Sequence, residues 1–210
     1  YDSGTTDLVK QTGASTMHAV STVRSIDWNA PEFDVQHGAL YPSTDFAGAL
    51  REVARLIRAD VGLRVACIDV GGWDTHSDMG RPEDPNSYFR GRCEELAGGL
   101  AAFYTDMGPD MAEVTVATIS EFGRTINENG TEGLDHGRAT AMMVMGGGIK
   151  GGVHGPFVSS IADGPEDDLT VLTDYRKVQP EVLTVRGGAS SATTIFPTWT
   201  PSAPLGLCNI

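Results

Sequence analysis

Two side chains of types that commonly bind metals stand close together in the stretch Val65 to His76. Asp74 and His76 follow an apolar run that ends at the glycine pair Gly71-Gly72. In an extended loop, residues i and i+2 project to the same side, so the Asp74 carboxylate and the His76 imidazole can share one ion. Mixed oxygen and nitrogen ligands suit Zn²⁺, Mn²⁺ or Fe better than Ca²⁺. The alternative is a loop in which Asp74 caps the next element and His76 is merely exposed.

Two further loops carry side chains of the same kinds. Glu121 and Arg124 follow one β-branched run, and Asp135 and His136 precede another. Glu121 is a candidate ligand or base, and Arg124 is a candidate anion clamp, because a planar guanidinium suits phosphate or sulfate. The alternative is a local Arg124–Glu121 pair that only rigidifies the loop. Asp135 is a candidate ligand, although we favour a role in which it holds the ring of His136 from behind.

The elements that must position these loops are three apolar runs, at residues 65–70, 114–119 and 141–145. We predict that each run is a buried strand. Helical patterns at about residues 44–57 and 88–107 alternate with them. This alternation predicts an α/β fold with a mostly parallel sheet and helices on both faces.

In such a sheet, ligands collect beyond the carboxyl ends of the strands. The runs that end near Val70 and Ile119 open on that edge, and a loop that folds back would bring Asp135 and His136 to it. We treat residues 1–210 as one domain. The sequence therefore predicts one metal site, with these candidate ligands: Asp74, His76, Glu121, Asp135 and His136.

The charge balance argues against polyanionic partners. The 210 residues include 28 acidic and 15 basic side chains, and the formal net charge is -13. This charge repels phosphate backbones and anionic membrane surfaces, so we expect no nucleic-acid partner. No apolar run is long enough to span a bilayer. Cys67 falls in a predicted core strand and Cys93 in a predicted helix, so buried thiols are expected, while one internal disulfide among the three cysteines stays open.

The glycine-rich segment that begins at Gly146 formally fits a dinucleotide-binding pattern. No helix can start at its last glycine, because Gly152, Gly155 and Pro156 follow. We therefore expect tight turns near the site rather than a nucleotide cradle.

Five motifs together resemble one family, the bacterial domain of unknown function 1501, which is placed within the alkaline phosphatase and sulfatase superfamily. The motifs are Gly71-Gly-Trp-Asp-Thr-His76, Ser120-Glu-Phe-Gly-Arg-Thr125, Leu134-Asp-His-Gly137, Gly146-Gly-Gly-Ile-Lys-Gly-Gly152 and Thr173-Asp-Tyr-Arg176. Their order and spacing are similar to the family from about residue 41 to residue 185.

The resemblance implies an alkaline-phosphatase-like fold in which Asp74, His76 and His136 hold one divalent metal: zinc, manganese or calcium. The superfamily's second metal takes an Asp-His pair, but this chain has Glu121-Phe122 at that place, and a phenylalanine cannot ligate. The chain also resembles only the C-terminal half of a member. The fold would then be incomplete, with the nucleophile lying upstream, and the resemblance implies an exported protein.

These inferences lead to two functional hypotheses. The first is a metal-dependent hydrolase or transferase that acts on a small phosphate or sulfate ester, with Glu121 and Arg124 as candidate catalytic residues. The second is a non-catalytic binding or structural module that kept the fold. Because half a parallel sheet would expose an apolar edge, we also expect self-association or a partner that covers that edge.

Overall fold

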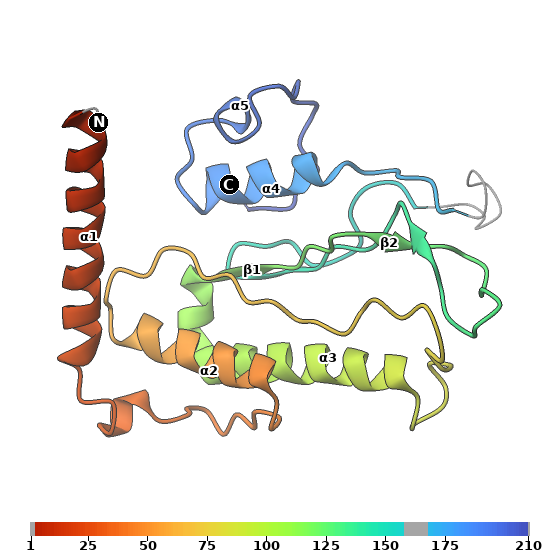
Figure 1. The fold of residues 1–210 in the computed structure, drawn as a ribbon, viewed down its shortest axis with the longest axis horizontal. Coiled ribbons are helices and arrows are strands. Elements are labelled where there is room, and N and C mark those ends of the chain that lie inside the picture. The colour runs from red at the N-terminus through yellow and green to blue at the C-terminus, as the bar shows by residue number, and fades with distance from the viewer. Residues whose placement is uncertain (1–2, 158–167, 210) are drawn as a thin grey trace.

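The computed structural model describes residues 3–157 and 168–209, and within them helices dominate over strands. The elements in chain order are α1 (Ser3–Arg24), η1 (Pro31–Phe33), α2 (Asp45–Arg58), α3 (Tyr88–Met107), η2 (Gly108–Glu113), β1 (Thr115–Ala117), β2 (Gly123–Arg124), β3 (His136–Gly137), β4 (Val144–Gly146), α4 (Tyr175–Val185) and α5 (Ala192–Ile195) (Figure 1).

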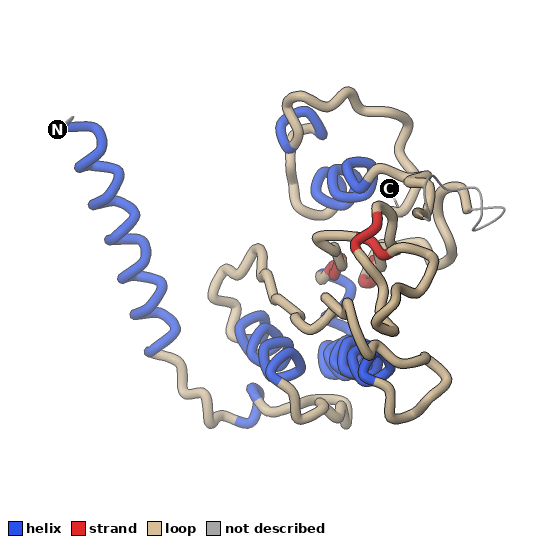
Figure 2. The backbone as a smooth tube through the Cα atoms, turned by 45° about the vertical axis from the view of Figure 1, so that its right-hand side comes forward, coloured by secondary structure: helices blue, strands red, loops and turns tan. Residues whose placement is uncertain are grey.

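Helices α2 and α3 lie side by side and begin and end at local sequence signals (Figures 1 and 2). The side chain of Thr44 accepts a hydrogen bond from the backbone N–H of Ala47, which satisfies a free donor in the first turn of α2. Ser87 does the same for Arg90 at the start of α3. Helix α3 ends where Gly108 adopts a φ of 50°. Both helices match the spans predicted from the sequence.

The main apolar core lies against these two helices. Its buried members are Phe46, Leu50, Ala54, Phe103, Met107 and Met111. Ile68 and Val70 from the extended segment before the site pack against this cluster, and so do Val116 of β1 and Met145 of β4. The extended part of the chain is therefore held on the helical layer by apolar contacts.

A buried charged cluster ties the loop before α2 to α3. The Asp106 side chain is fully buried, and its Oδ1 lies 2.6 Å from Nη2 of Arg58, whose own side chain is only 10% exposed. The Tyr41 hydroxyl donates to Asp106 Oδ2 at 2.9 Å, and the backbone N–H of Gln36 donates to Oδ1 at 2.6 Å. Burial, and then the hydrogen bond to Asp106, raise the pKa of Tyr41 well above its ordinary value. The phenol therefore stays protonated and keeps donating.

In the part of the chain that the structure describes, the four strands form one long, interrupted antiparallel hairpin. Strand β1 pairs with β4, where Thr115 lies opposite Gly146, and β2 pairs with β3, where Gly123 lies opposite Gly137. The outgoing arm of the hairpin carries β1 and β2, and it advances eight residues from Thr115 to Gly123. The returning arm carries β3 and β4, and it advances nine residues from Gly137 to Gly146. The returning arm thus holds one extra residue, as a β-bulge does. We call residues 123–137 the hairpin tip.

The predicted fold class is wrong. Within the described residues, both sheets are two-stranded and antiparallel, so the mostly parallel sheet with helices on both faces does not form. The runs at 114–119 and 141–145 do contain strands, but these strands are partners in the hairpin. The reason is the connection: parallel neighbours need a crossover, usually a helix, and residues 120–140 form none.

The predicted strand at residues 65–70 does not form either. The segment is extended but carries no strand assignment, and Val65 is 71% exposed. Ile68 and Val70 face the core, while Cys67 is exposed, so the expectation of a buried Cys67 thiol is also wrong. Only one side of this segment is covered. All three cysteines are free thiols, with Cys93 partly buried and Cys208 buried.

Helix α4 packs on the other side of the β1–β4 pair (Figure 1). Val178 and Val182 of α4 form a second buried cluster with Leu207 and Cys208, and Val144 of β4 packs against it. Because alternate residues of a strand face opposite sides, Val144 contacts this cluster while its neighbour Met145 contacts the main core.

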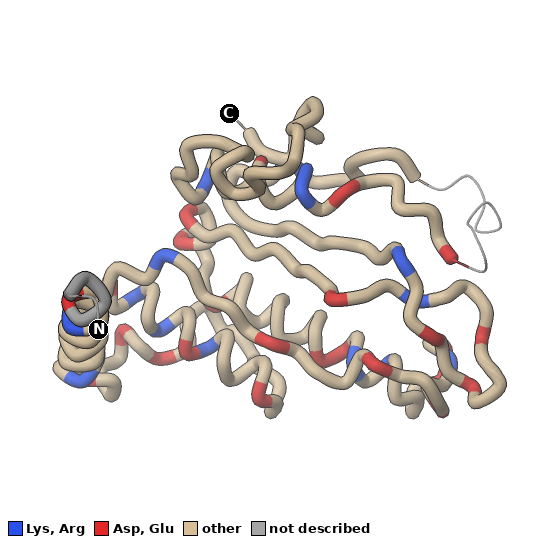
Figure 3. The backbone as a smooth tube through the Cα atoms, turned by 45° about the horizontal axis from the view of Figure 1, so that its top comes forward, with Lys and Arg blue, Asp and Glu red and all other residues tan. Residues whose placement is uncertain are grey.

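Helix α1 projects away from the other elements (Figures 1 and 2). Leu8, Val9 and Met17 on it are each more than 60% exposed. No helix within the described residues combines the length and apolar character needed to cross a bilayer. Figure 3 shows the Lys and Arg positions spread along the backbone among the acidic positions, rather than gathered in one stretch.

Candidate metal centre

The loop after Val70 and the hairpin tip run alongside each other. The backbone N–H of Leu134 donates to the Thr75 carbonyl at 3.1 Å, and the N–H of Asp78 donates to the Thr131 carbonyl at 3.0 Å. A third such bond links the Met79 N–H to the Glu132 carbonyl at 2.9 Å. These bonds bring together residues that lie more than 50 positions apart in the chain.

The contact between the two segments requires a glycine at position 133. A β-carbon on Gly133 would overlap backbone atoms of His76 and Ser77, which cannot move away as a flexible side chain could. By contrast, a β-carbon on Gly130 in the same loop would meet open space. The close approach that carries His76 to the tip therefore depends on the missing side chain of Gly133.

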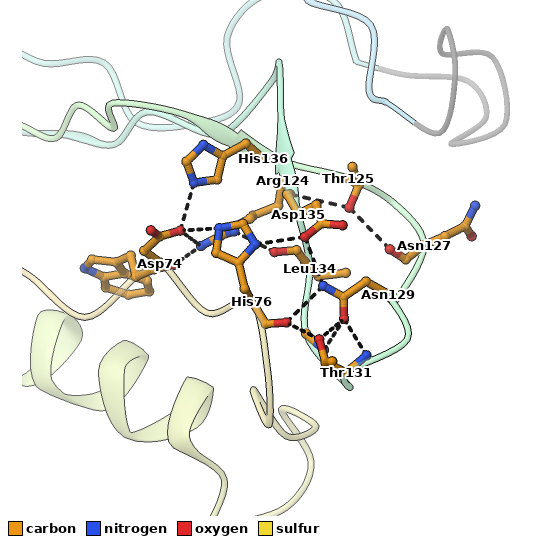
Figure 4. A network of polar contacts seen from close by, with 12 residues as sticks. Asp74, His76, Arg124, Thr125, Asn127, Asn129, Thr131, Leu134, Asp135 and His136 are labelled. Atoms are coloured by element: carbon orange, nitrogen blue, oxygen red, sulfur yellow. Dashed lines mark hydrogen bonds and ion pairs between the residues drawn. The ribbon is translucent and has the colours of Figure 1, made fainter.

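Asp74, His76 and His136 converge on one point, as the sequence predicted (Figure 4). One possible ligand atom from each of the three lies within 4.8 Å of the others. Nε2 of His76 is 3.0 Å from Oδ1 of Asp74, and Nε2 of His136 is 2.8 Å from the same oxygen. The three side chains are 48% to 58% exposed, so the point is open to solvent. They meet at a hairpin tip rather than at the edge of a parallel sheet.

Asp135 contacts His76 and not its neighbour His136. Its Oδ1 is 2.8 Å from Nδ1 of His76. Consecutive residues of an extended strand point to opposite sides, which explains why Asp135 turns away from the ring of His136. The hydrogen bond with His76, followed by one from Asn129, lowers the pKa of Asp135. The prediction that Asp135 holds a histidine ring from behind thus fits His76, but it named the wrong histidine.

Arg124 joins the two segments. Its guanidinium donates to the carbonyls of Trp73 and Leu134, and Nη2 also lies 3.0 Å from Oδ1 of Asp74. No hydrogen bond or ion pair between Arg124 and Glu121 occurs in the described structure, so the local pair considered above does not form. The pKa of Asp74 is lowered, first by the hydrogen bond with His136 and then by the one from Arg124.

Glu121 lies outside the group of three candidate ligands. It is exposed, and among the described residues its side chain has no hydrogen-bond or ion-pair partner. The next residue, Phe122, stacks on His136 with ring centroids 4.1 Å apart and planes 10° from parallel. The guanidinium of Arg124 lies over the same phenyl ring, 4.6 Å from its centroid. Phe122 therefore occupies one face of the His136 imidazole with apolar surface.

Two residues of the site, Asn129 and Thr131, were not anticipated. The Asn129 amide donates to Oδ1 of Asp135 at 3.0 Å and to the His76 carbonyl at 2.9 Å. The Thr131 hydroxyl donates to that carbonyl as well, at 2.7 Å. The available signal was the Asn-Gly-Thr sequence at 129–131, which is typical of a tight turn. That signal predicts the turn but not what the turn contacts.

The remaining residues named in the sequence analysis lie elsewhere. Asp174 caps α4 by accepting from the backbone N–H of Arg176 and pairs with its guanidinium. His154, a further histidine just after the glycine-rich segment, contacts the Lys150 carbonyl at 2.8 Å. Gly146 ends β4, and no helix follows the glycine-rich segment before residue 158.

Comparison with known protein families gives one match. The family described as "Protein of unknown function (DUF1501)" matches residues 17–172. The chain belongs to this family. No curated protein and no solved structure matches it. The family description names no activity, so the case for a function depends on the site itself.

Proposed function

We propose that the chain contributes a metal centre to a hydrolase or transferase that acts on a phosphate or sulfate ester. The observation that carries this proposal is the convergence of Asp74, His76 and His136 from two segments about 60 residues apart. Exposed acidic groups often gather without an ion, but two imidazole nitrogens on one carboxylate oxygen form a donor set typical of zinc or manganese sites.

The details of the donor set fit a divalent cation. Both histidines present Nε2 toward Asp74, and the opposite nitrogen of His76 is held by the Asp135 carboxylate. A carboxylate behind a ligating histidine is the arrangement that fixes ring orientation and raises ligand basicity in metal proteins. With three protein ligands and half-exposed side chains, the site leaves room for a substrate oxygen.

The roles of the individual side chains follow from their contacts. Asp74, His76 and His136 would hold the cation, and Arg124 would keep Asp74 in place while adding positive charge beside it. A bound cation would supply Lewis acidity, which polarises an ester oxygen or lowers the pKa of a coordinated water. Because the Arg124 guanidinium already serves two carbonyls and Asp74, we assign it a positioning part rather than the anion clamp expected from the sequence.

The choice of a phosphate or sulfate ester depends on the resemblance of the motifs to the alkaline phosphatase and sulfatase superfamily. Within that proposal, one metal per site is favoured over two. Phe122 stands where a second histidine ligand would be needed, and its ring is already stacked on His136.

The same stacking supports an alternative function, a binding module without catalysis. An apolar ring stacked on His136 brings neither a ligand atom nor a proton donor or acceptor to that side of the site. Such a module would still bind a metal through Asp74, His76 and His136, but it would turn over no ester. The two proposals therefore differ in activity and agree on the metal.

The test begins with metal binding. The purified chain, freed of metal by chelation, is titrated with Zn²⁺, Mn²⁺ and Ca²⁺ by calorimetry, beside His76→Ala and His136→Ala. We expect one site that binds zinc or manganese and loses at least about tenfold in affinity in either variant. His18→Ala, on the exposed face of α1, is the matched control and should bind as the parent does. Absence of a stoichiometric site in the parent would end both proposals.

Activity then separates the two functions. The longest natural form of the protein is assayed with aryl phosphate and aryl sulfate esters, with and without the metal that binds. Metal-dependent turnover that disappears in His136→Ala supports the enzyme. Metal binding without turnover supports the binding module.

A further inference from the structure

The two ring nitrogens of His76 face two different carboxylates. Nδ1 lies 2.8 Å from Oδ1 of Asp135, and Nε2 lies 3.0 Å from Oδ1 of Asp74. A neutral imidazole carries one proton, and only the nitrogen without it can ligate a cation. The position of that single proton therefore decides whether Nε2 is available beside Asp74.

Asp74 competes for this proton. Its Oδ1 lies within 3.0 Å of Nε2 of His76, of Nε2 of His136 and of Nη2 of Arg124. If the His76 proton sat on Nε2, it would complete a hydrogen bond to Asp74 and block the ligand position. A partner that holds the proton on Nδ1 is needed to prevent this.

Asn129 is placed to secure that partner. Its Nδ2 donates to Oδ1 of Asp135 at 3.0 Å and to the carbonyl of His76 itself at 2.9 Å. One side chain thus fixes both ends of the contact, the carboxylate that accepts from Nδ1 and the backbone that carries the ring (Figure 4).

The orientation of the Asn129 amide is itself determined. Its Oδ1 accepts from the backbone N–H groups of Thr131 and Gly133, at 3.0 Å and 3.1 Å, and lies 2.9 Å from the Thr131 hydroxyl oxygen. A flipped amide would set its NH₂ against two backbone donors, so the NH₂ must point to Asp135. The turn at the hairpin tip therefore supplies a preorganised donor.

We propose that Asn129 is a positioning residue that anchors Asp135, keeps the His76 proton on Nδ1 and so leaves Nε2 free to ligate beside Asp74. This inference rests on the proposed metal function for its purpose, but the proton position can be measured without any metal. Two readouts therefore test the two ideas separately.

The first readout is the tautomer of His76 in the metal-free protein. Long-range ¹H–¹⁵N spectra distinguish a protonated ring nitrogen from a bare one, and they also separate a neutral ring from a doubly protonated one. We expect the Nδ1–H form in the parent chain and an increased Nε2–H fraction in Asn129→Ala. Asp135→Ala should give the same change, because Asn129 acts through Asp135.

Thr131→Val is the matched control. The Thr131 hydroxyl donates to the same His76 carbonyl and lies 2.9 Å from Asn129 Oδ1, but it makes no hydrogen bond with Asp135. Its loss loosens the turn without freeing the carboxylate, so the Nδ1–H form should persist. An unchanged tautomer in Asn129→Ala, or an equal change in Thr131→Val, would overturn the inference.

The second readout is zinc affinity. We expect Asn129→Ala and Asp135→Ala each to weaken binding by about 10- to 100-fold, the usual effect of removing a residue that supports a ligand. The double variant should bind about as weakly as either single variant, since both act on one contact. Additive losses would overturn the inference. If the parent binds no zinc, the proposed function fails. The tautomer comparison would still decide whether Asn129 keeps the His76 proton on Nδ1.

Discussion

Asp106 and Asp74 each gather several hydrogen-bonding groups around one carboxylate, but they do so in opposite environments. Asp106 is fully buried and is satisfied by Arg58, Tyr41 and a backbone N–H. Asp74 is 58% exposed and faces two histidines and an arginine. The contacts of Asp106 join α3 to α2 and to the loop before α2. Around Asp74, by contrast, the histidine nitrogens are exposed, so each could exchange its contact with the carboxylate for a bond to a cation. Burial, rather than residue type, separates the structural cluster from the candidate functional one.

The largest effect should come from breaking the buried cluster. Asp106→Ala leaves the Arg58 guanidinium without its counter-charge in a site that is 90% covered. We expect a loss of about 3 to 5 kcal/mol in the free energy of unfolding, measured by urea denaturation. Glu52→Ala, which breaks an exposed pair with Arg55 on the same helix as Arg58, is the control and should cost little. Similar losses in the two variants would remove the distinction between the clusters.

A smaller effect is expected where the exposed cluster is assembled. Gly133→Ala places a methyl group against the backbone of His76 and Ser77 and should cost about 1 to 3 kcal/mol of stability. It should also weaken metal binding, because His76 is displaced. Gly130→Ala, where the methyl group meets nothing, should leave both quantities unchanged. Equal stability and equal metal affinity in the two variants would argue against the close approach of Gly133 to the His76 backbone.

A third carboxylate, the partly buried Asp174, should have an intermediate and pH-dependent effect. It caps α4 and pairs with Arg176, which lowers its pKa. A lowered pKa means that the charged form stabilises the fold above the ordinary aspartate pKa of about 3.9, and that this contribution is lost as the pH falls through the folded value. Asp174→Ala should therefore cost about 1 kcal/mol near neutral pH and progressively less in acid.

The control for that effect is Asp174→Asn, because asparagine also caps helices but carries no charge. Denaturation curves from neutral pH down to about pH 3 should show a nearly constant difference between Asp174→Asn and Asp174→Ala. The assignment would be contradicted if the parent chain were no more stable than Asp174→Asn near neutral pH, or if its advantage did not shrink as the pH falls.

The smallest effect on stability is expected at the metal site. His76→Ala should change the free energy of unfolding by less than about 1 kcal/mol, because its ring is half exposed and its ion pairs are surface pairs. Denaturation of the metal-free protein measures this. A loss as large as that of Asp106→Ala would show that the exposed cluster is structural after all.

The helical layer could be predicted from local signals. The apolar periodicity of α2, Thr44 before it and Gly108 after α3 are all visible in the sequence. The sheet could not, because strand pairing depends on contacts between distant residues. One warning was present: residues 120–140 contain no helical pattern, which is incompatible with a parallel crossover and compatible with a hairpin.

The site was predictable in its residue types but not in its connections. Asp74, His76 and His136 could be selected because few other residues combine these ligand types beside strand-like runs. Which carboxylate supports which histidine could not be deduced, since Asp135 precedes His136 in sequence yet reaches His76 in space. Asn129 was invisible for the same reason: its role arises from a turn that folds onto another loop.

The extra residue in the returning arm of the hairpin limits which deletions and insertions the chain can tolerate. Removing one amino acid from the stretch 138–142 would shift the pairing of either β3 with β2 or β4 with β1 by one position. A shift of one position turns the side chains of that strand to the opposite face. Either the Met145 contact with the helices or the His136 contact with Asp74 would then be lost. Apart from Met142, which packs against the second buried cluster, this short connector should accept substitutions more readily than a change in its length.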